Sequence, residues 1–193
     1  MNDALGEIDS ISTRTKFSYG LGALGKDFAC SIVYLFLMYY YTDVAGVPAA
    51  FVGTLFLVVR IIDAVSDPVM GMIVDNTRSR FGKFRPWIIL GTVTNSLALL
   101  ALFSAHLFSG SQLLFFVTVT YIVWGLTYTI MDIPFWSMVP ALSARREERE
   151  RLVVWPRLFA SIAWTIVGTY GLASIAFLGK GDEGIGFLLL SGL

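Results

Sequence analysis

The chain has 193 residues, of which 56% are hydrophobic and 15% are charged, and its formal net charge is zero. Together with a mean hydropathy of +0.72, this composition excludes an ordinary soluble domain and indicates a membrane protein. The neutral charge balance gives no support for nucleic-acid binding, and Cys30, the only cysteine, excludes an internal disulfide.

The chain divides into a polar start and a series of apolar spans. Residues 1–16 lack an apolar core followed by a small-residue cleavage site, so we expect a cytoplasmic N-terminal segment and no removable signal peptide. Residues 17–193 are predicted to form a transmembrane helix bundle, because apolar stretches of about 20 residues can cross the hydrocarbon core of a lipid bilayer. The predicted spans are 17–41, 49–74, 87–108, 112–139 and 152–178, and a sixth starts near Gly184 and stops with the chain at Leu193.

Basic residues are distributed unevenly among the predicted loops. They gather before the first span, between the second and third, and between the fourth and fifth, whereas the other loops contain only Lys180. Short cytoplasmic loops collect Lys and Arg, so we expect a multi-pass protein of the inner (plasma) membrane with a cytoplasmic N-terminus. The residues concerned are Arg14, Lys16, Arg78, Arg80, Lys83, Arg85, Arg145, Arg146, Arg149 and Arg151.

Several charged residues fall inside the predicted spans. A charge at the bilayer centre costs about 3 kcal/mol even on lenient scales, so such a residue normally faces a partner or a water-filled cavity and marks a solute or ion pathway. These residues are Lys26, Asp27, Arg60, Asp63, Asp67, Asp132 and Arg157.

The second span has the densest polar chemistry. Arg60, Asp63 and Asp67 are spaced i, i+3, i+7 and share one helical face, with Ser66 beside it. Pro68 cannot donate a hydrogen bond to the carbonyl four residues earlier, which leaves a further oxygen free. Hard oxygen ligands suit sodium, lithium or a proton better than a transition metal. The alternative is an internal Arg–Asp pair that fixes helix packing, although two carboxylates beside one arginine leave one charge over.

The fourth span repeats a spacing of four residues, with Trp124, Tyr128, Asp132 and Trp136 along one side and Thr129 one step round. A carboxylate that accepts from hydroxyls, beside an indole that packs on the apolar face of a pyranose, can hold a sugar. Packing between helices is the alternative role for any one of these rings.

Other spans contribute charges at similar depth. Lys26 and Asp27 on the first span and Arg157 on the fifth can add donors and acceptors to the same cavity. The alternative is mutual neutralisation, which does not account for all of the charges inside the spans.

Four segments, SYGLGALGKDFACSIVYLFLMYYYTDV, GTLFLVVRIIDAVSDPVMGMIVDNTRSRFGKFRPWI, FSAHLF and TYIVWGLTYTIMDIPFWSMVP, resemble the melibiose permease branch of the glycoside–pentoside–hexuronide:cation symporters of the major facilitator superfamily. The resemblance extends over about residues 15–187. It implies an all-α membrane protein, the N-terminal six-helix half of a secondary active transporter, truncated within the sixth helix. It also implies symport of a galactoside such as melibiose with a monovalent cation, by alternating access and with no other cofactor.

The resemblance also implies roles for individual residues. It places the cation, sodium or lithium, on Asp63 and Asp67 with help from Thr129. Ser66 stands where sodium-using permeases typically have asparagine, so sodium, lithium and proton remain alternatives. Galactoside recognition is placed on Lys26, Asp27, Tyr128, Asp132, Trp136 and Arg157.

Other functions remain open at this point. Relatives of this family also carry other glycosides, pentosides and hexuronides. Because the C-terminal half that closes such a cavity is absent, the chain is expected to be incompetent alone, whether it is a fragment, a truncated reading frame or a half that pairs with a partner, and a non-transporting membrane module stays an alternative. An intramembrane aspartyl protease is disfavoured, because GALGKD is the nearest match to its motifs.

Overall fold

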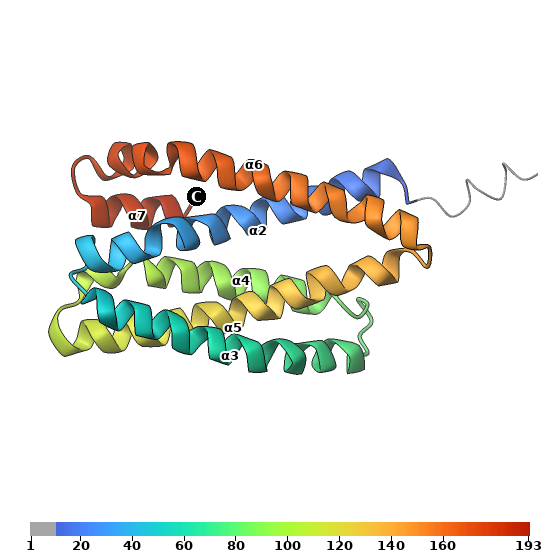
Figure 1. Cartoon of the computed structure of the whole chain (residues 1–193), viewed down its shortest axis with the longest axis horizontal. Coiled ribbons are helices and arrows are strands. Elements are labelled where there is room, and N and C mark those ends of the chain that lie inside the picture. The colour runs from blue at the N-terminus through green and yellow to red at the C-terminus, as the bar shows by residue number, and fades with distance from the viewer. Residues whose placement is uncertain (1–10) are drawn as a thin grey trace, which may run out of the picture.

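The computed structural model describes residues 11–193, and all secondary structure in that range is helical. Five of its helices are long and apolar enough to cross a membrane, which confirms the predicted all-α membrane fold. The predicted segment 1–16 lies largely outside the described residues, and α2 begins within it at Thr13. In chain order the elements are α2 (Thr13–Tyr39), η1 (Tyr40–Val44), α3 (Ala49–Asn76), α4 (Arg85–Leu102), η2 (Ala105–Leu107), α5 (Gly110–Leu142), α6 (Arg146–Gly179) and α7 (Glu183–Ser191), as Figure 1 shows.

Local side chains set several helix ends. The Ser12 hydroxyl accepts the backbone N–H of Thr15 at 3.2 Å and so caps the start of α2. The Asp182 carboxylate does the same for Ile185 at 3.0 Å at the start of α7. Helix α6 ends at Gly179, and Lys180, which follows it, adopts a left-handed conformation (φ 49°).

The predicted third span, 87–108, is wrong at its end, because α4 stops at Leu102. The hydroxyl of Tyr40 donates to the carbonyl of Phe103 at 2.7 Å. The Phe103 ring stacks on Phe187, with 5.4 Å between the ring centroids. These fully buried contacts turn the chain aside into η2. Hydropathy alone does not reveal this turn, since the residues that make it are also apolar.

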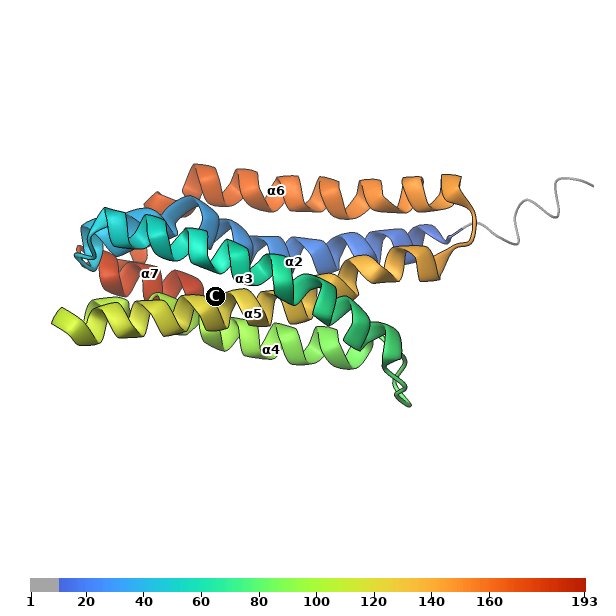
Figure 2. The ribbon, with the colours of Figure 1, turned by 60° about the horizontal axis from the view of Figure 1, so that its bottom comes forward.

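The helices pack as two groups joined at the centre. Helix α2 packs along α6, α7 packs on α6, and α5 packs on both α3 and α4. In Figure 2, α6 and α4 lie at opposite edges of the bundle, with α2, α3 and α5 between them. Helices α2 and α5 therefore occupy the middle, where polar side chains of the two groups can meet.

One end of the bundle carries the N-terminal side of α2, the α3–α4 loop and the α5–α6 loop (Figure 1). At this end the buried carboxylate of Glu148 accepts the Lys16 ammonium at 3.0 Å and the Ile11 N–H at 3.2 Å. Arg151 lies 3.4 Å from the same carboxylate. These contacts hold the starts of α2 and α6 together, and they explain why α6 begins at Arg146, earlier than the apolar pattern predicts.

Gly91→Ala is expected to loosen the crossing of α4 and α5. A Cβ at this position would lie 2.6 Å from the backbone nitrogen and 2.8 Å from the Cα of Met131. Overpacking of this kind costs roughly 1–3 kcal/mol, so the melting temperature of the detergent-purified protein should fall by about 2–10 °C. Gly53→Ala is the matched control, because no atom lies within 4 Å of its added Cβ. Equal losses in the two variants would contradict the packing argument.

Candidate functional site

Lys26 of α2 is the centre of a buried polar cluster. Its side chain is 6% exposed, and its ammonium lies 2.5 Å from Asp132 Oδ1 on α5 and 3.7 Å from Asp27 Oδ2. The same ammonium donates to the Tyr128 hydroxyl at 3.2 Å. One lysine thus partners two carboxylates from different helices and joins the two helix groups. Burial makes each of these ion pairs costly to break on one side only.

Aromatic rings surround this lysine. The Lys26 ammonium lies 5.4 Å from the ring centroids of Tyr128 and Phe135 and 5.7 Å from that of Trp136, within cation–π range. Trp124 and Tyr128 are stacked, with their centroids 5.5 Å apart. The predicted stripe along one side of α5 is confirmed, and its middle faces α2.

Asp63 and Asp67 of α3 line a cavity of ≈ 190 Å³ against α5. Thr129 donates to Asp67 Oδ1 at 2.9 Å across the two helices. A water occupies about 30 Å³ in the liquid, so this volume accommodates a cation with a few waters, and it is below the roughly 300 Å³ of a typical organic-ligand pocket. The lining residues are Tyr34, Arg60, Asp63, Asp67, Trp124, Gly125, Tyr128, Thr129, Asp132 and Ile133.

Asp63 has one oxygen in an ion pair and one without a partner. Arg60 lies 3.5 Å from Asp63 Oδ2, and its side chain is 54% exposed. Arg60 also donates to the Tyr34 hydroxyl at 2.6 Å. Asp63 Oδ1 is buried, and it accepts no hydrogen bond from any residue in 11–193. A buried acceptor of this kind requires an explanation such as a bound ion or water.

The Lys26 cluster and the cavity lined by Asp63 and Asp67 together carry excess negative charge. Lys26 and Arg60 are the basic members, and Asp27, Asp63, Asp67 and Asp132 are the acidic members, which leaves a formal excess of two negative charges. Within residues 11–193 no group of three or more His, Cys, Asp and Glu side chains is arranged to hold a metal ion. The cavity lining offers a cation the carboxylate oxygens of three aspartates and the hydroxyl oxygens of Thr129 and Tyr128, which are hard ligands that suit a small hard ion.

Two predicted site residues neither line this cavity nor contact Lys26. Ser66 donates to the carbonyl of Asp63 at 3.3 Å and does not line the cavity. Arg157 lines a separate groove between α5 and α6, beside Val139 and Arg149. The other predicted residues either line the cavity or contact Lys26.

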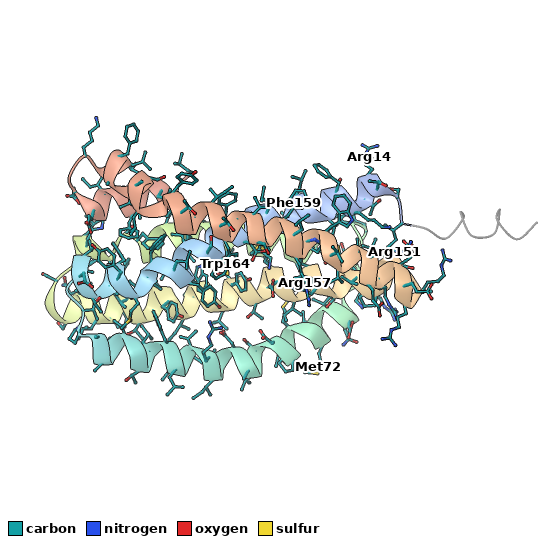
Figure 3. All side chains as sticks on the ribbon, turned by 45° about the horizontal axis from the view of Figure 1, so that its top comes forward. Arg14, Met72, Arg151, Arg157, Phe159 and Trp164 are labelled. Carbon is teal, nitrogen blue, oxygen red and sulfur yellow. The ribbon has the colours of Figure 1, made fainter. Side chains whose placement is uncertain are left out.

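Three residues near the cavity, Tyr34, Trp164 and Gly125, are not among the site residues predicted from the sequence. Tyr34 and Trp164 follow Asp27 and Arg157, respectively, by seven residues, so helical spacing places each on the face of a predicted residue. In Figure 3, Arg157 and Trp164 lie on the same side of α6, its lower side in this view. Nothing in the sequence indicates that Gly125 lies at the cavity.

Gly125 permits the approach of α3 to α5 at the cavity. A Cβ at this position would lie 3.1 Å from Val59 Cγ1 and 3.3 Å from Asp63 Oδ1. The glycine therefore leaves room for the unpartnered carboxylate oxygen on the neighbouring helix.

Comparison with known proteins identifies the family. A family model described as "MFS/sugar transport protein" matches residues 18–190, and the chain belongs to this family. The family description confirms the predicted superfamily.

Curated relatives match most of this chain. It is 36% identical over 177 residues to the "Putative glycoside/cation symporter YagG" of Escherichia coli (strain K12), covering 92% of this chain and 38% of the relative. It is 36% identical over 171 residues to the "Isoprimeverose transporter" of Lactiplantibacillus pentosus, covering 86% and 35%. It is 38% identical over 161 residues to the "Glucuronide carrier protein homolog" of Escherichia coli (strain K12), covering 80% and 34%. The chain thus spans little more than a third of the length of these relatives.

Proposed function

We propose that this chain forms the cation- and sugar-binding wall of a symporter that carries a glycoside and a monovalent cation across the inner membrane by alternating access. Family membership supports transport, and the name of one relative supports glycoside and cation as cargo. The observation that carries the proposal is the buried, unpartnered Oδ1 of Asp63 in a cavity that also holds Asp67.

The proposed cation site consists of Asp63 and Asp67, with Thr129 as a hydroxyl ligand. Ser66 would join it through a rotation of its hydroxyl away from the Asp63 carbonyl. Sodium, lithium and a proton all suit carboxylate and hydroxyl oxygens. The two excess negative charges favour binding of any of these three cations.

The proposed sugar site consists of Lys26, Asp27, Tyr128, Asp132 and Trp136, with Arg157 at its far end. Carboxylates accept from sugar hydroxyls, and the Trp136 indole offers an apolar face to the ring. Trp164, which contacts Asp27, lies seven residues from Arg157, about 10 Å along α6. A disaccharide such as melibiose suits this length, and other glycosides, pentosides or hexuronides would use the same groups.

The two proposed sites share residues. Tyr128 and Asp132 line the cavity beside the α3 carboxylates, and both also contact Lys26. A cation that neutralises Asp63 and Asp67 changes the field at Asp132, which alters how strongly Lys26 and Asp132 bind a sugar. By linkage, the sugar must change the affinity for the cation by the same factor and in the same direction.

The complete carrier is proposed to include a second helical bundle that closes the cavity. Two observations support this: the chain matches 38% of a curated relative, and Tyr34 on the cavity wall is 44% exposed. The basic loops at one end of the bundle favour a cytoplasmic N-terminus.

Uptake by the full-length protein tests the proposal. Cells that lack their own glycoside carriers would express it and receive p-nitrophenyl galactoside, xyloside or glucuronide with sodium, with lithium or with a proton gradient alone. We expect uphill accumulation of at least one glycoside and a requirement for one cation. Absence of uptake and binding of all three glycosides under every cation condition would contradict the proposed function and favour a non-transporting membrane module.

A further inference from the structure

A second connection between the two proposed sites runs through aromatic residues. The Trp164 indole N–H donates to Asp27 Oδ1 at 3.4 Å. The Trp164 ring lies 6.0 Å from the Tyr34 ring, centroid to centroid, at an interplanar angle of 31°. The Tyr34 hydroxyl accepts from Arg60, whose guanidinium also lies 5.0 Å from the centre of the same ring. Arg60 in turn pairs with Asp63.

We propose that Tyr34 and Trp164 are positioning residues that couple glycoside binding at Asp27 to cation binding at Asp63. The inference rests on the proposed function and adds two residues to it. It depends on a series of contacts that leads from Asp27 through Trp164, Tyr34 and Arg60 to Asp63. This series does not pass through Asp132, which lies at both proposed sites.

Both oxygens of Asp27 already have partners. Oδ2 faces Lys26 and Oδ1 accepts from Trp164. A sugar hydroxyl that binds Asp27 must therefore share or displace the indole N–H. Since Trp164 is in contact with Tyr34, a shift of the indole moves the Tyr34 ring against Arg60.

Arg60 has two competing partners at the other end of this path. It lies 2.6 Å from the Tyr34 hydroxyl and 3.5 Å from Asp63 Oδ2. When Arg60 binds Tyr34 more strongly, its guanidinium moves away from Asp63, and the Asp63 carboxylate becomes available to the cation. The path also runs from the cation site to the sugar site. A bound cation would displace Arg60 from Asp63 toward Tyr34 and so, through Tyr34 and Trp164, prepare Asp27 for the sugar.

Trp164→Phe tests the connection, because it keeps an aromatic ring beside Tyr34 and removes, with the pyrrole part of the indole, the N–H that donates to Asp27. The measured quantity is the ratio of glycoside Kd without cation to glycoside Kd with saturating cation, in the full-length protein. The probes are sodium or lithium and whichever p-nitrophenyl glycoside the wild type binds. We expect this ratio to fall about fivefold, as for the loss of one hydrogen bond, while the glycoside Kd without cation changes less than the ratio.

Two further variants complete the test. Tyr34→Phe removes the acceptor for Arg60 and should lower the same ratio, which keeps the inference testable if Trp164→Phe does not fold. Trp155→Phe on α6 is the matched control, since Trp155 contacts Phe17 and Phe159 and not the cavity. An unchanged ratio in Trp164→Phe and Tyr34→Phe would overturn the inference alone, whereas a wild type that binds no glycoside would overturn the proposed function as well.

Discussion

Asp67→Asn is expected to abolish uphill glycoside accumulation while downhill glycoside entry continues. The amide retains an acceptor for Thr129, which donates to Asp67 Oδ1 at 2.9 Å, but it removes one of the two excess negative charges. A unit charge about 4 Å from a cation contributes roughly 4 kcal/mol at an effective dielectric constant of about 20. Cation binding should therefore weaken by at least about a hundredfold.

The measurement compares the steady-state accumulation ratio with the rate of downhill entry in the same vesicles. Glu147→Gln is the matched control, because it makes the same acid-to-amide change at an exposed position at the start of α6. Undiminished accumulation in Asp67→Asn, with the cation requirement of the wild type, would remove Asp67 from the cation site.

Lys26→Met is expected to destabilise the protein and to eliminate glycoside binding. The substitution leaves Asp27 and Asp132 without their shared cation in a largely buried cluster. Removing one partner of a buried ion pair typically costs about 3–5 kcal/mol. Thermal unfolding of the detergent-purified protein should show a lower melting temperature, and a glycoside-binding assay should show no saturable signal.

The double variant Lys26→Met/Asp132→Asn separates stability from binding. Neutralising Asp132 should recover most of the melting temperature, because it removes the nearer of the two unpaired charges, 2.5 Å from the lysine in the native cluster. Glycoside binding should stay absent, since both a donor and an acceptor of the proposed sugar site are lost. A double variant as unstable as Lys26→Met would show that the lost ion pair is not the cause.

Spacing along a single helix predicts much of this molecule. The four-residue repeat of Trp124, Tyr128, Asp132 and Trp136 correctly predicts one polar and aromatic face on α5, and the spacing of Asp63 and Asp67 predicts that they share a face toward one cavity. Both predictions use only helical geometry, which the sequence determines directly.

Contacts between helices were less accessible from the sequence. The acid that partners Lys26 most closely is Asp132, 106 positions later in the chain, and nothing local selects it over the other acids. Ser66 is adjacent to the acidic face by spacing, yet its hydroxyl donates to the backbone carbonyl of Asp63 on the same helix. The approach of α3 to α5 depends on close contacts such as the one at Gly125, where the absence of a side chain leaves the room.

The excess of two negative charges has an electrical consequence for the proposed symporter. When the transporter changes conformation, an empty site carries two negative charges, whereas a site loaded with one monovalent cation carries a single negative charge. The membrane potential acts on each elementary charge with about 2.3 kcal/mol per 100 mV. An interior-negative voltage therefore pushes the empty site toward the outside more strongly than it pushes the loaded one. Charging the membrane would then accelerate the return of the unloaded carrier, the half of the cycle in which no cargo crosses.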